Sequence, residues 1–172
     1  MLERSGLISV GGEDQTIMGP DLEVGQLAPE FTAIANDWEE RNPLQETAGK
    51  VRVLAAVPSL ETSVCDRETK SFNEEAVGLG EDVNIFVIST DLPFTQKRWC
   101  EANGVDRVEM LSDHYYTDFG TKYGCLIKEK RFLRRAVFVI GRDGKLNYVE
   151  YLPELGLDPD YDALLKAVRE AL

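Results

Sequence analysis

The sequence is poor in the residues that build disulfide scaffolds and metal centres. It has 172 residues but only three cysteines and one histidine. An odd number of widely spaced cysteines argues against a structural disulfide framework and for reduced or catalytic thiols in a cytoplasm. The nearest two candidate zinc ligands, His114 and Cys125, are much further apart than the paired ligands of structural zinc sites. We therefore expect no bound metal.

Long apolar runs and basic residues are also scarce. No apolar run approaches the ~20 residues that a membrane-spanning helix needs, and residues 1–10 lack the long apolar segment of an export signal. With 31 acidic and 19 basic residues the formal net charge is −12, which repels phosphate backbones. We expect a cytoplasmic protein with no membrane or nucleic-acid partner. The length and the absence of repeats or linkers predict one domain over residues 1–172.

Strand-like and helix-like patterns alternate along the chain. Strands are predicted at 31–35, 51–57, 83–89 and 108–111, with a hairpin from 135–140 and 146–151. Helices are predicted from near Ser63, over 94–102, over 115–123 and from Tyr161 to the end. Near the start, 7–10 and 16–18 predict a β-hairpin with a loose turn at 11–14. This order predicts an α/β protein with a thioredoxin-like fold, in which helices flank a central mixed sheet.

The junction between strand 51–57 and the next helix contains a cysteine. Pro58 forces an extended turn, and Thr62 or Ser63 can cap the helix, so Cys65 falls in the first helical turn. Unpaired backbone N–H groups and the positive end of the helix dipole favour a negative charge there. The sequence therefore predicts a thiolate at this position. The polar residues that follow are expected to face water: Arg67, Glu68, Lys70, Asn73 and Glu74.

These residues also carry a family resemblance. The pattern Pro58-x-x-x-Thr62-x-x-Cys65 resembles the active-site signature of the peroxiredoxins. Together with Phe72-Asn73 and the segment 89–94 (STDLPF), it is similar to the bacterial thiol peroxidases, which are atypical two-cysteine peroxiredoxins. The resemblance implies that the protein reduces hydrogen peroxide or alkyl hydroperoxides, needs no bound cofactor, is recycled by thioredoxin and forms a homodimer.

The same resemblance assigns roles to individual residues. Cys65 would attack the peroxide, Pro58 would shield the thiolate from water, and Thr62 would position the peroxide. Arg135 would polarise it from the start of a strand; Arg134 is adjacent, but neighbouring strand residues point to opposite faces, so only one of the two can face Cys65. Cys100 stands where the thiol peroxidases carry their resolving cysteine.

Simple chemistry shows what the site must add to a thiolate. An ordinary thiol has a pKa near ~8.5, so full ionisation at neutral pH gains at most about 30-fold. Most of a large acceleration must come from donors aimed at the two peroxide oxygens. Because Cys65 and Cys100 are both expected in helices, and a disulfide requires Cα atoms about 4.4 to 6.8 Å apart, we predict that one or both helices unwind locally before the bond forms.

Two alternative functions of the thiols are considered. A dithiol oxidoreductase of the thioredoxin type is disfavoured because the sequence has no CxxC: Thr62 stands in the place of the first cysteine, and Glu68 follows Cys65 by three residues. A redox sensor that uses a Cys65–Cys100 switch to change its binding surface is the alternative from another class. Cys125 is expected to be a core residue, because buried cysteines commonly act as small apolar side chains.

Overall fold

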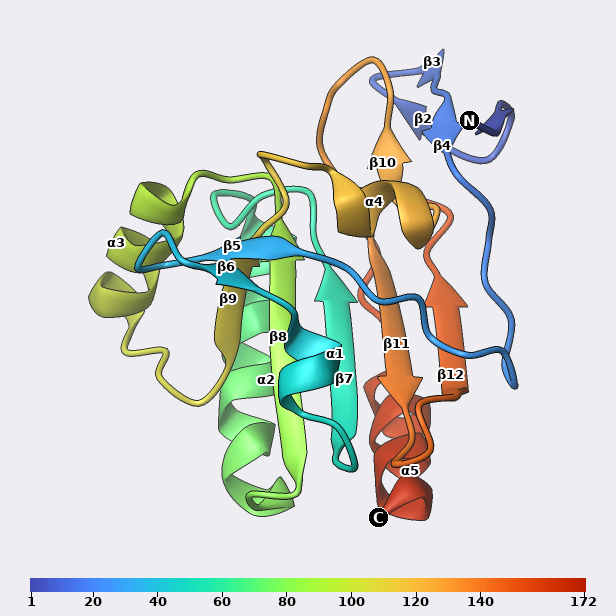
Figure 1. Cartoon of the computed structure of the whole chain (residues 1–172). Coiled ribbons are helices and arrows are strands. Elements are labelled where there is room, and N and C mark those ends of the chain that lie inside the picture. The colour runs from blue at the N-terminus through green and yellow to red at the C-terminus, as the bar shows by residue number, and fades with distance from the viewer.

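A seven-stranded mixed sheet forms the centre of the protein in the computed structural model, which describes all 172 residues (Figure 1). Its strands, in spatial order, are β12 (Leu146–Tyr151), β11 (Ala136–Ile140), β7 (Val51–Ala56), β8 (Val83–Ser89), β9 (Glu109–Ser112), β5 (Ala33–Ala35) and β6 (Glu40–Arg41). The neighbours β7, β8 and β9 are parallel, whereas the remaining pairs are antiparallel. The parallel strands explain why the runs 51–57 and 83–89 are almost entirely apolar.

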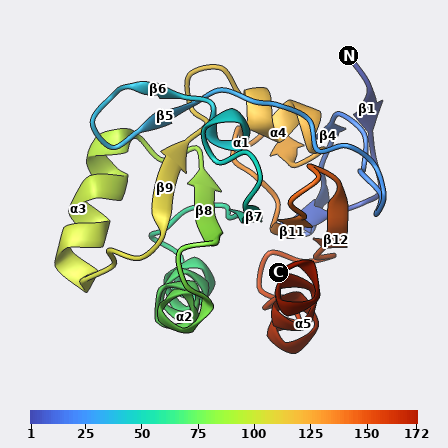
Figure 2. The same cartoon turned by 60° about the horizontal axis from the view of Figure 1, so that its bottom comes forward.

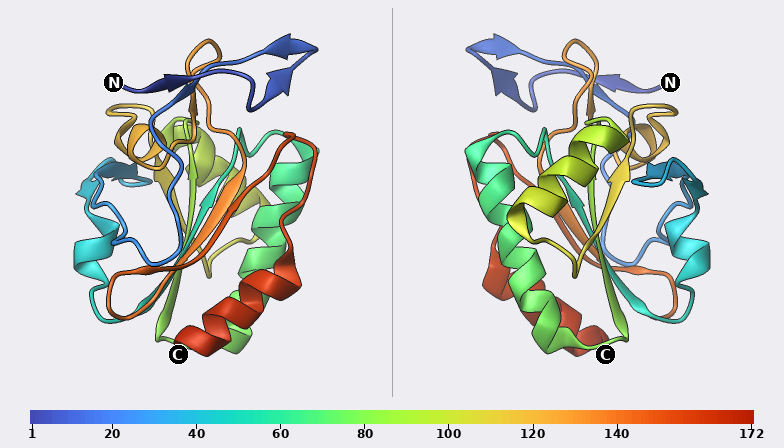
Figure 3. Two further views of the ribbon diagram at one scale, coloured as in Figure 1. Left: turned by 90° about the vertical axis from the view of Figure 1, so that its right-hand side faces the viewer. Right: turned by 90° about the vertical axis from the view of Figure 1, so that its left-hand side faces the viewer.

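Helices cover both faces of this sheet. Helices α2 (Ser63–Leu79) and α5 (Tyr161–Ala171) lie on one face, and the short α1 (Pro43–Glu46) and α4 (Asp118–Lys122) lie on the other (Figures 2 and 3). Helix α3 (Pro93–Asn103) packs against β9. The predicted central mixed sheet with flanking helices is thus confirmed. No helix is both long and apolar enough to cross a bilayer.

Each face of the sheet has its own apolar core. Along β7, Val51, Val53 and Ala55 belong to the cluster beneath α2 and α5, whereas Leu54 and Ala56 belong to the cluster on the opposite face. This alternation follows from the two-residue period of a strand. Both clusters are built mainly from fully buried side chains. The sheet therefore holds the carboxyl end of β7, from which the chain runs to Cys65, in a fixed position.

The N-terminal strands pair differently from the prediction. Strand β2 (Ser9–Val10) pairs with β3 (Glu13–Asp14) across Gly11 and Gly12, whose φ angles of 62° and 83° suit a tight two-residue turn. Strand β4 (Ile17–Met18) pairs instead with β1 (Glu3–Arg4) and β10 (Leu126–Ile127). The predicted loose turn and the pairing of 7–10 with 16–18 were wrong. The two glycines close the hairpin early, which frees β4 for partners far away in the sequence.

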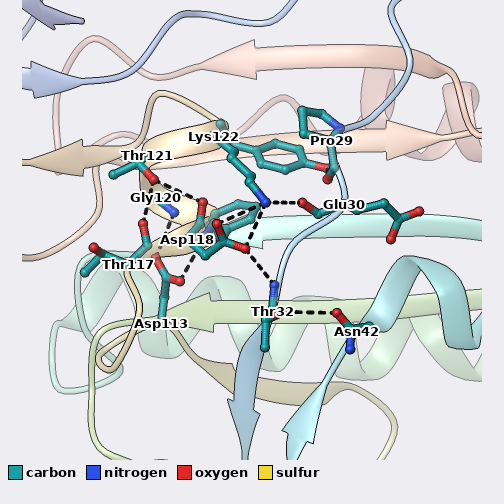
Figure 4. A network of polar contacts seen from close by, with 12 residues as sticks. Pro29, Glu30, Thr32, Asn42, Asp113, Thr117, Asp118, Gly120, Thr121 and Lys122 are labelled. Atoms are coloured by element: carbon teal, nitrogen blue, oxygen red, sulfur yellow. Dashed lines mark hydrogen bonds and ion pairs between the residues drawn. The ribbon is translucent and has the colours of Figure 1, made fainter. Parts of the chain in front are cut away.

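A polar network fastens the segment before β5 to α4 (Figure 4). Asp118 accepts a hydrogen bond from the Thr32 amide at 2.9 Å, and Lys122 donates to the Glu30 carbonyl at 2.7 Å. Buried Asp113 accepts from the backbone amides of Phe119 and Gly120 at the start of α4, while burial raises its pKa to about 7. These contacts close the sheet face opposite α2. Helix α2, which carries Cys65, lies on the other face of the sheet.

Candidate active site

Cys65 lies in the first turn of α2, where the chain leaves the central sheet. Thr62 is the N-cap, with extended backbone angles, and its hydroxyl accepts a hydrogen bond from the Cys65 amide at 3.3 Å. Of the two predicted cap residues, the structure therefore selects Thr62. The Cys65 side chain is fully buried against the apolar cluster beneath α2 and α5. The dipole of a helix of this length favours a thiolate at its N-terminus.

Arg135 supplies a cation to this sulfur. Its Nη2 lies 3.1 Å from the Cys65 Sγ, and both Nε and Nη2 donate to the Leu155 carbonyl at 3.2 and 3.0 Å. Burial opposes the charge of Arg135, but Glu68 and Cys65 outweigh this effect and raise the pKa of the guanidinium. Arg135 thus stays charged inside the protein. With the Leu155 carbonyl as an anchor, the guanidinium is fixed in one orientation against the thiol.

The neighbouring arginine serves another part of the molecule. Arg134 Nε donates to the Gly124 carbonyl at 2.8 Å, and its Nη2 pairs with Asp21. Its guanidinium carbon also lies 4.1 Å from the centre of the Tyr151 ring. The two arginines stand just before β11, which begins at Ala136, and extend to opposite faces of the sheet, as predicted from the alternation of side chains along an extended chain. Only Arg135 reaches Cys65.

Glu68 is a site residue that sequence reasoning missed. We expected it to face water, but it is fully buried and forms an ion pair with Nη1 of Arg135. Burial raises the pKa of Glu68 to about 7, although the charge of Arg135 and its hydrogen bond oppose the shift. Its second oxygen, Oε1, has no hydrogen-bond partner. The available signal was the spacing: a residue three positions after Cys65 lies on the same helix face.

A small apolar pocket opens beside the Arg135 guanidinium, which separates it from the fully buried Cys65. It has a volume of about 290 Å³ and is lined by Pro58, Ser59, Thr62, Val64, Phe132, Arg135, Leu155 and Gly156. Pro58 is buried, whereas Thr62 is exposed and its hydroxyl donates to the Ser59 carbonyl at 3.2 Å. The Thr62 hydroxyl makes no hydrogen bond to Sγ in this state. It can swing from the Ser59 carbonyl to an oxygen that enters the pocket, because hydroxyl hydrogens rotate freely.

Cys100 lies apart from this pocket, in the intact helix α3. All three cysteines are free thiols, so the structure represents the reduced protein. Cys100 is half-buried and packs against the same apolar cluster as Cys65. Burial, with a smaller effect of Glu101, raises the pKa of Cys100 to about 11. In this arrangement Cys100 is almost entirely protonated at neutral pH and is a poor nucleophile.

The remaining candidate ligands do not form a site. Cys125 is fully buried in the other apolar cluster, as predicted, and burial raises its pKa to about 12. His114 contacts the Ser112 hydroxyl at 2.7 Å. No group of three or more His, Cys, Asp or Glu side chains is arranged to hold a metal ion.

The geometry of the site defines a class of protein. A cysteine at a helix N-terminus, a guanidinium on its sulfur and a pocket just large enough for a small substrate are typical of proteins that use a thiolate for redox chemistry. Comparison with known proteins places the chain within that class: residues 24–149 match the model of the AhpC/TSA family, and the protein belongs to this family.

Relatives and solved structures agree with this assignment. The chain is 53% identical to a thiol peroxidase of Oceanobacillus iheyensis over 87% of its length and 90% of that protein. It is 46% identical to a thiol peroxidase of Bacillus subtilis, with 94% and 96% of the two chains covered. A peroxiredoxin-like protein from Aquifex aeolicus superposes with a TM-score of 0.86 at 40% identity, over 98% and 99% of the chains. The predicted resemblance to bacterial thiol peroxidases and the thioredoxin-like fold are confirmed.

Proposed function

We propose that the protein is a thiol peroxidase that reduces hydroperoxides with the Cys65 thiolate. The observation that carries this proposal is the 3.1 Å contact between the Cys65 Sγ and Nη2 of Arg135, a residue that lines a pocket. The thiolate attacks the nearer oxygen of the hydroperoxide and the O–O bond breaks. Cys65 becomes a sulfenic acid, and the second oxygen leaves as water or an alcohol after it takes up a proton.

The surroundings of Cys65 support the attack by stabilising charge. Ionisation of the thiol gains at most about 30-fold at neutral pH, and a lower pKa also makes the thiolate less nucleophilic. The larger share of the acceleration falls to donors that meet the negative charge as it spreads over sulfur and the two oxygens. Arg135, the Thr62 hydroxyl and the first-turn amides of α2 are the donors at this place.

Cys100 is the proposed resolving cysteine. Its thiolate attacks the Cys65 sulfenic acid, a disulfide forms and hydroxide leaves to become water; an external dithiol, of which thioredoxin is our candidate, then reduces the disulfide. Because α2 and α3 are both intact in the reduced protein, we propose that local unwinding brings the two cysteines together. Unwinding also exposes Cys100, which removes the burial that keeps its pKa near 11.

The pocket favours hydroperoxides with an apolar substituent. Pro58, Val64, Phe132 and Leu155 line the pocket beside Arg135, and a chain of a few carbons fits its volume of about 290 Å³. Hydrogen peroxide needs only the polar end of this space, at Arg135. We therefore propose that both hydrogen peroxide and alkyl hydroperoxides are substrates.

A homodimer is also proposed, on the basis of an exposed aromatic patch. Phe94 is 69% exposed and its ring centre lies 4.8 Å from that of Trp38, which is itself 44% exposed. Tyr115 and Tyr116 continue the patch. Aromatic residues are enriched at interfaces between protein chains, so a second copy of the chain is the proposed occupant. A purely monomeric protein in sedimentation velocity would contradict it. A cytoplasmic location is also proposed, because three widely spaced cysteines suit a reducing compartment.

A steady-state assay with thioredoxin, its reductase, NADPH and several hydroperoxides tests the proposal. The wild-type protein is expected to consume many peroxides per molecule, and Cys65→Ser to consume none, because serine cannot supply a comparable nucleophile. The redox-sensor alternative predicts one oxidation per molecule and capture of a partner protein. Turnover numbers near one with thioredoxin in excess would favour that alternative.

A further inference from the structure

A partly buried aspartate joins the loop before Cys65 to the helix that carries Cys100. Asp91 lies between β8 and α3, two residues before Pro93. Its Oδ1 accepts a hydrogen bond from the Ser59 hydroxyl at 2.8 Å, and its Oδ2 accepts from the Leu60 amide at 2.9 Å. Ser59 and Leu60 belong to the short connection between β7 and the N-cap of α2. The carboxylate thus binds a segment that lies far from it in the sequence.

Further bonds fix Asp91 itself to the sheet. The Ser89 hydroxyl donates to Oδ2 at 2.8 Å, and the Ser112 hydroxyl donates to the Asp91 carbonyl at 2.5 Å. Both serines are fully buried at the ends of their strands. With three donors on its two oxygens, the carboxylate is held as an acceptor from several directions. Such charge-assisted bonds are stronger than bonds between neutral groups.

The network continues into the first turn of α3. Gln96 is fully buried, and its Nε2 donates to the Ser89 hydroxyl at 3.1 Å and to the Leu111 carbonyl at 3.0 Å. The chain of contacts therefore runs from Gln96 through Ser89 and Asp91 to the Leu60 amide. The other link between the two segments, Arg98 to Glu61, is exposed and long, at 3.5 Å, so it contributes little. Asp91 is the main polar connection between the cysteine loop and α3.

We propose that Asp91 is a positioning residue that controls the balance between peroxide attack and disulfide formation. This inference rests on the proposed function of Cys65 and Cys100. Bound to Ser59 and Leu60, Asp91 holds the Pro58–Thr62 segment in the geometry needed for attack. The same bonds resist the local unwinding that must precede the meeting of the two cysteines. Their release allows the Cys100 thiol to reach the Cys65 sulfenic acid, and the disulfide forms with loss of one water.

Asp91→Asn tests this role because it keeps the shape of the side chain but removes the charge and one acceptor oxygen. Rapid mixing with tert-butyl hydroperoxide, followed by trapping of sulfenic acid and of disulfide, separates the two chemical steps; Trp99, next to Cys100 and buried, gives a fluorescence signal for opening of α3. We expect attack to slow and disulfide formation to accelerate, each by about tenfold, since weakening charged hydrogen bonds shifts such an equilibrium by that order. Over-oxidation of Cys65 should need about tenfold more peroxide.

Matched variants keep the test decisive. Asp106→Asn makes the same chemical change in an exposed residue beyond the other end of α3, and both rates should remain within about twofold of wild type. Ser59→Ala removes one of the two bonds to the loop and should shift both rates in the same directions as Asp91→Asn, by about threefold. If Asp91→Asn fails to fold, the two rates measured for Ser59→Ala test the proposal by themselves.

Failure of the role proposed for Asp91 and failure of the proposed resolution step give different results. Unchanged or slower disulfide formation in Asp91→Asn and in Ser59→Ala, with a wild-type protein that forms the Cys65–Cys100 bond, overturns the inference alone. A wild-type protein in which peptide mapping finds no Cys65–Cys100 bond after peroxide treatment overturns the proposed resolution step, on which the inference rests.

Discussion

Cys65 and Cys125 are equally buried, yet their surroundings differ. Both side chains are fully inaccessible, and each lies close to one of two consecutive arginines. The Cys65 Sγ receives a hydrogen bond from Arg135 at 3.1 Å, at the positive end of α2. Cys125 lies among apolar side chains, and its Sγ contacts the Tyr123 carbonyl at 3.4 Å. The Arg134 backbone amide donates to the Cys125 carbonyl at 2.7 Å, while the Arg134 guanidinium binds the Gly124 carbonyl and Asp21.

The comparison teaches that burial does not decide the reactivity of a thiol. Burial alone disfavours the thiolate, and at Cys125 it raises the pKa to about 12. A thiolate in an equally buried place needs fixed positive charge and donors that face the sulfur. Under the proposed function, the direction in which an arginine points separates a reactive cysteine from an inert one, even where the two arginines are neighbours in the sequence.

The largest effects are expected when each arginine is replaced in turn. Arg135→Met should lower kcat/KM for hydroperoxides by about 10²- to 10³-fold, as loss of a donor to a developing negative charge does in other enzymes. Arg134→Met should leave kcat/KM within about twofold. It should instead lower the free energy of unfolding by about 2 kcal/mol through loss of the buried hydrogen bond to Gly124, while half-exposed Asp21 is rehydrated. Single-turnover kinetics and urea unfolding measure the two effects, and a large loss of activity in Arg134→Met would show that both arginines act on Cys65.

Glu68 adds a titratable carboxyl group to the surroundings of Cys65 through its ion pair with Arg135. Its pKa is raised from 4.5 to about 7 in the folded protein, so the folded state binds its proton more tightly than the unfolded chain. The free energy of unfolding should therefore be highest below pH 4.5 for this group and should fall as pH rises to about 7, by about 1.4 kcal/mol for each unit of pKa difference.

Glu68→Gln should flatten this part of the stability profile, because glutamine does not titrate and still accepts a hydrogen bond from Arg135. Urea unfolding at several pH values between 4.5 and 8 measures the slope in both proteins. Equal slopes in wild type and variant would mean that Glu68 is ionised throughout, with a pKa that the ion pair to Arg135 keeps low.

The smallest effect is expected at Cys125. Cys125→Ala should leave peroxide turnover within about twofold and lower the free energy of unfolding by about 1 kcal/mol, because a small buried side chain is lost. The thioredoxin-coupled assay and thermal unfolding provide the measurements. A loss of turnover would mean that Cys125, and not Cys100, resolves the sulfenic acid.

Local patterns predicted much of the framework around the site. The helix predicted over 94–102 is α3, which Pro93 begins and Gly104, with a φ of 64°, ends, in keeping with the preferences of the two residues. Strands β7 and β8 match the two apolar runs closely. These features depend on neighbours in the sequence, so the sequence alone can reveal them.

The predictions from sequence failed where contacts between distant segments set the structure. Strand β10 was not predicted, because two apolar residues become a strand only when β4 pairs with them. Glu68 looked like a solvent-facing residue because charged neighbours surround it, and only the ion pair with Arg135 makes its burial tolerable. The short α1 and β6 were also missed, since segments of this length have weak patterns of their own.

The sequence alone places Cys65 in the first turn of a helix that follows a buried strand, with Thr62 as a possible cap, because turns and caps are local. It also determined, through alternation along a strand, that Arg134 and Arg135 point to opposite faces. The tertiary fold is needed to bring Arg135 to both Cys65 and Glu68, and Asp91 to the loop before Cys65. Those contacts join segments more than thirty residues apart, and packing of the sheet and its helices, rather than local preference, sets their distances.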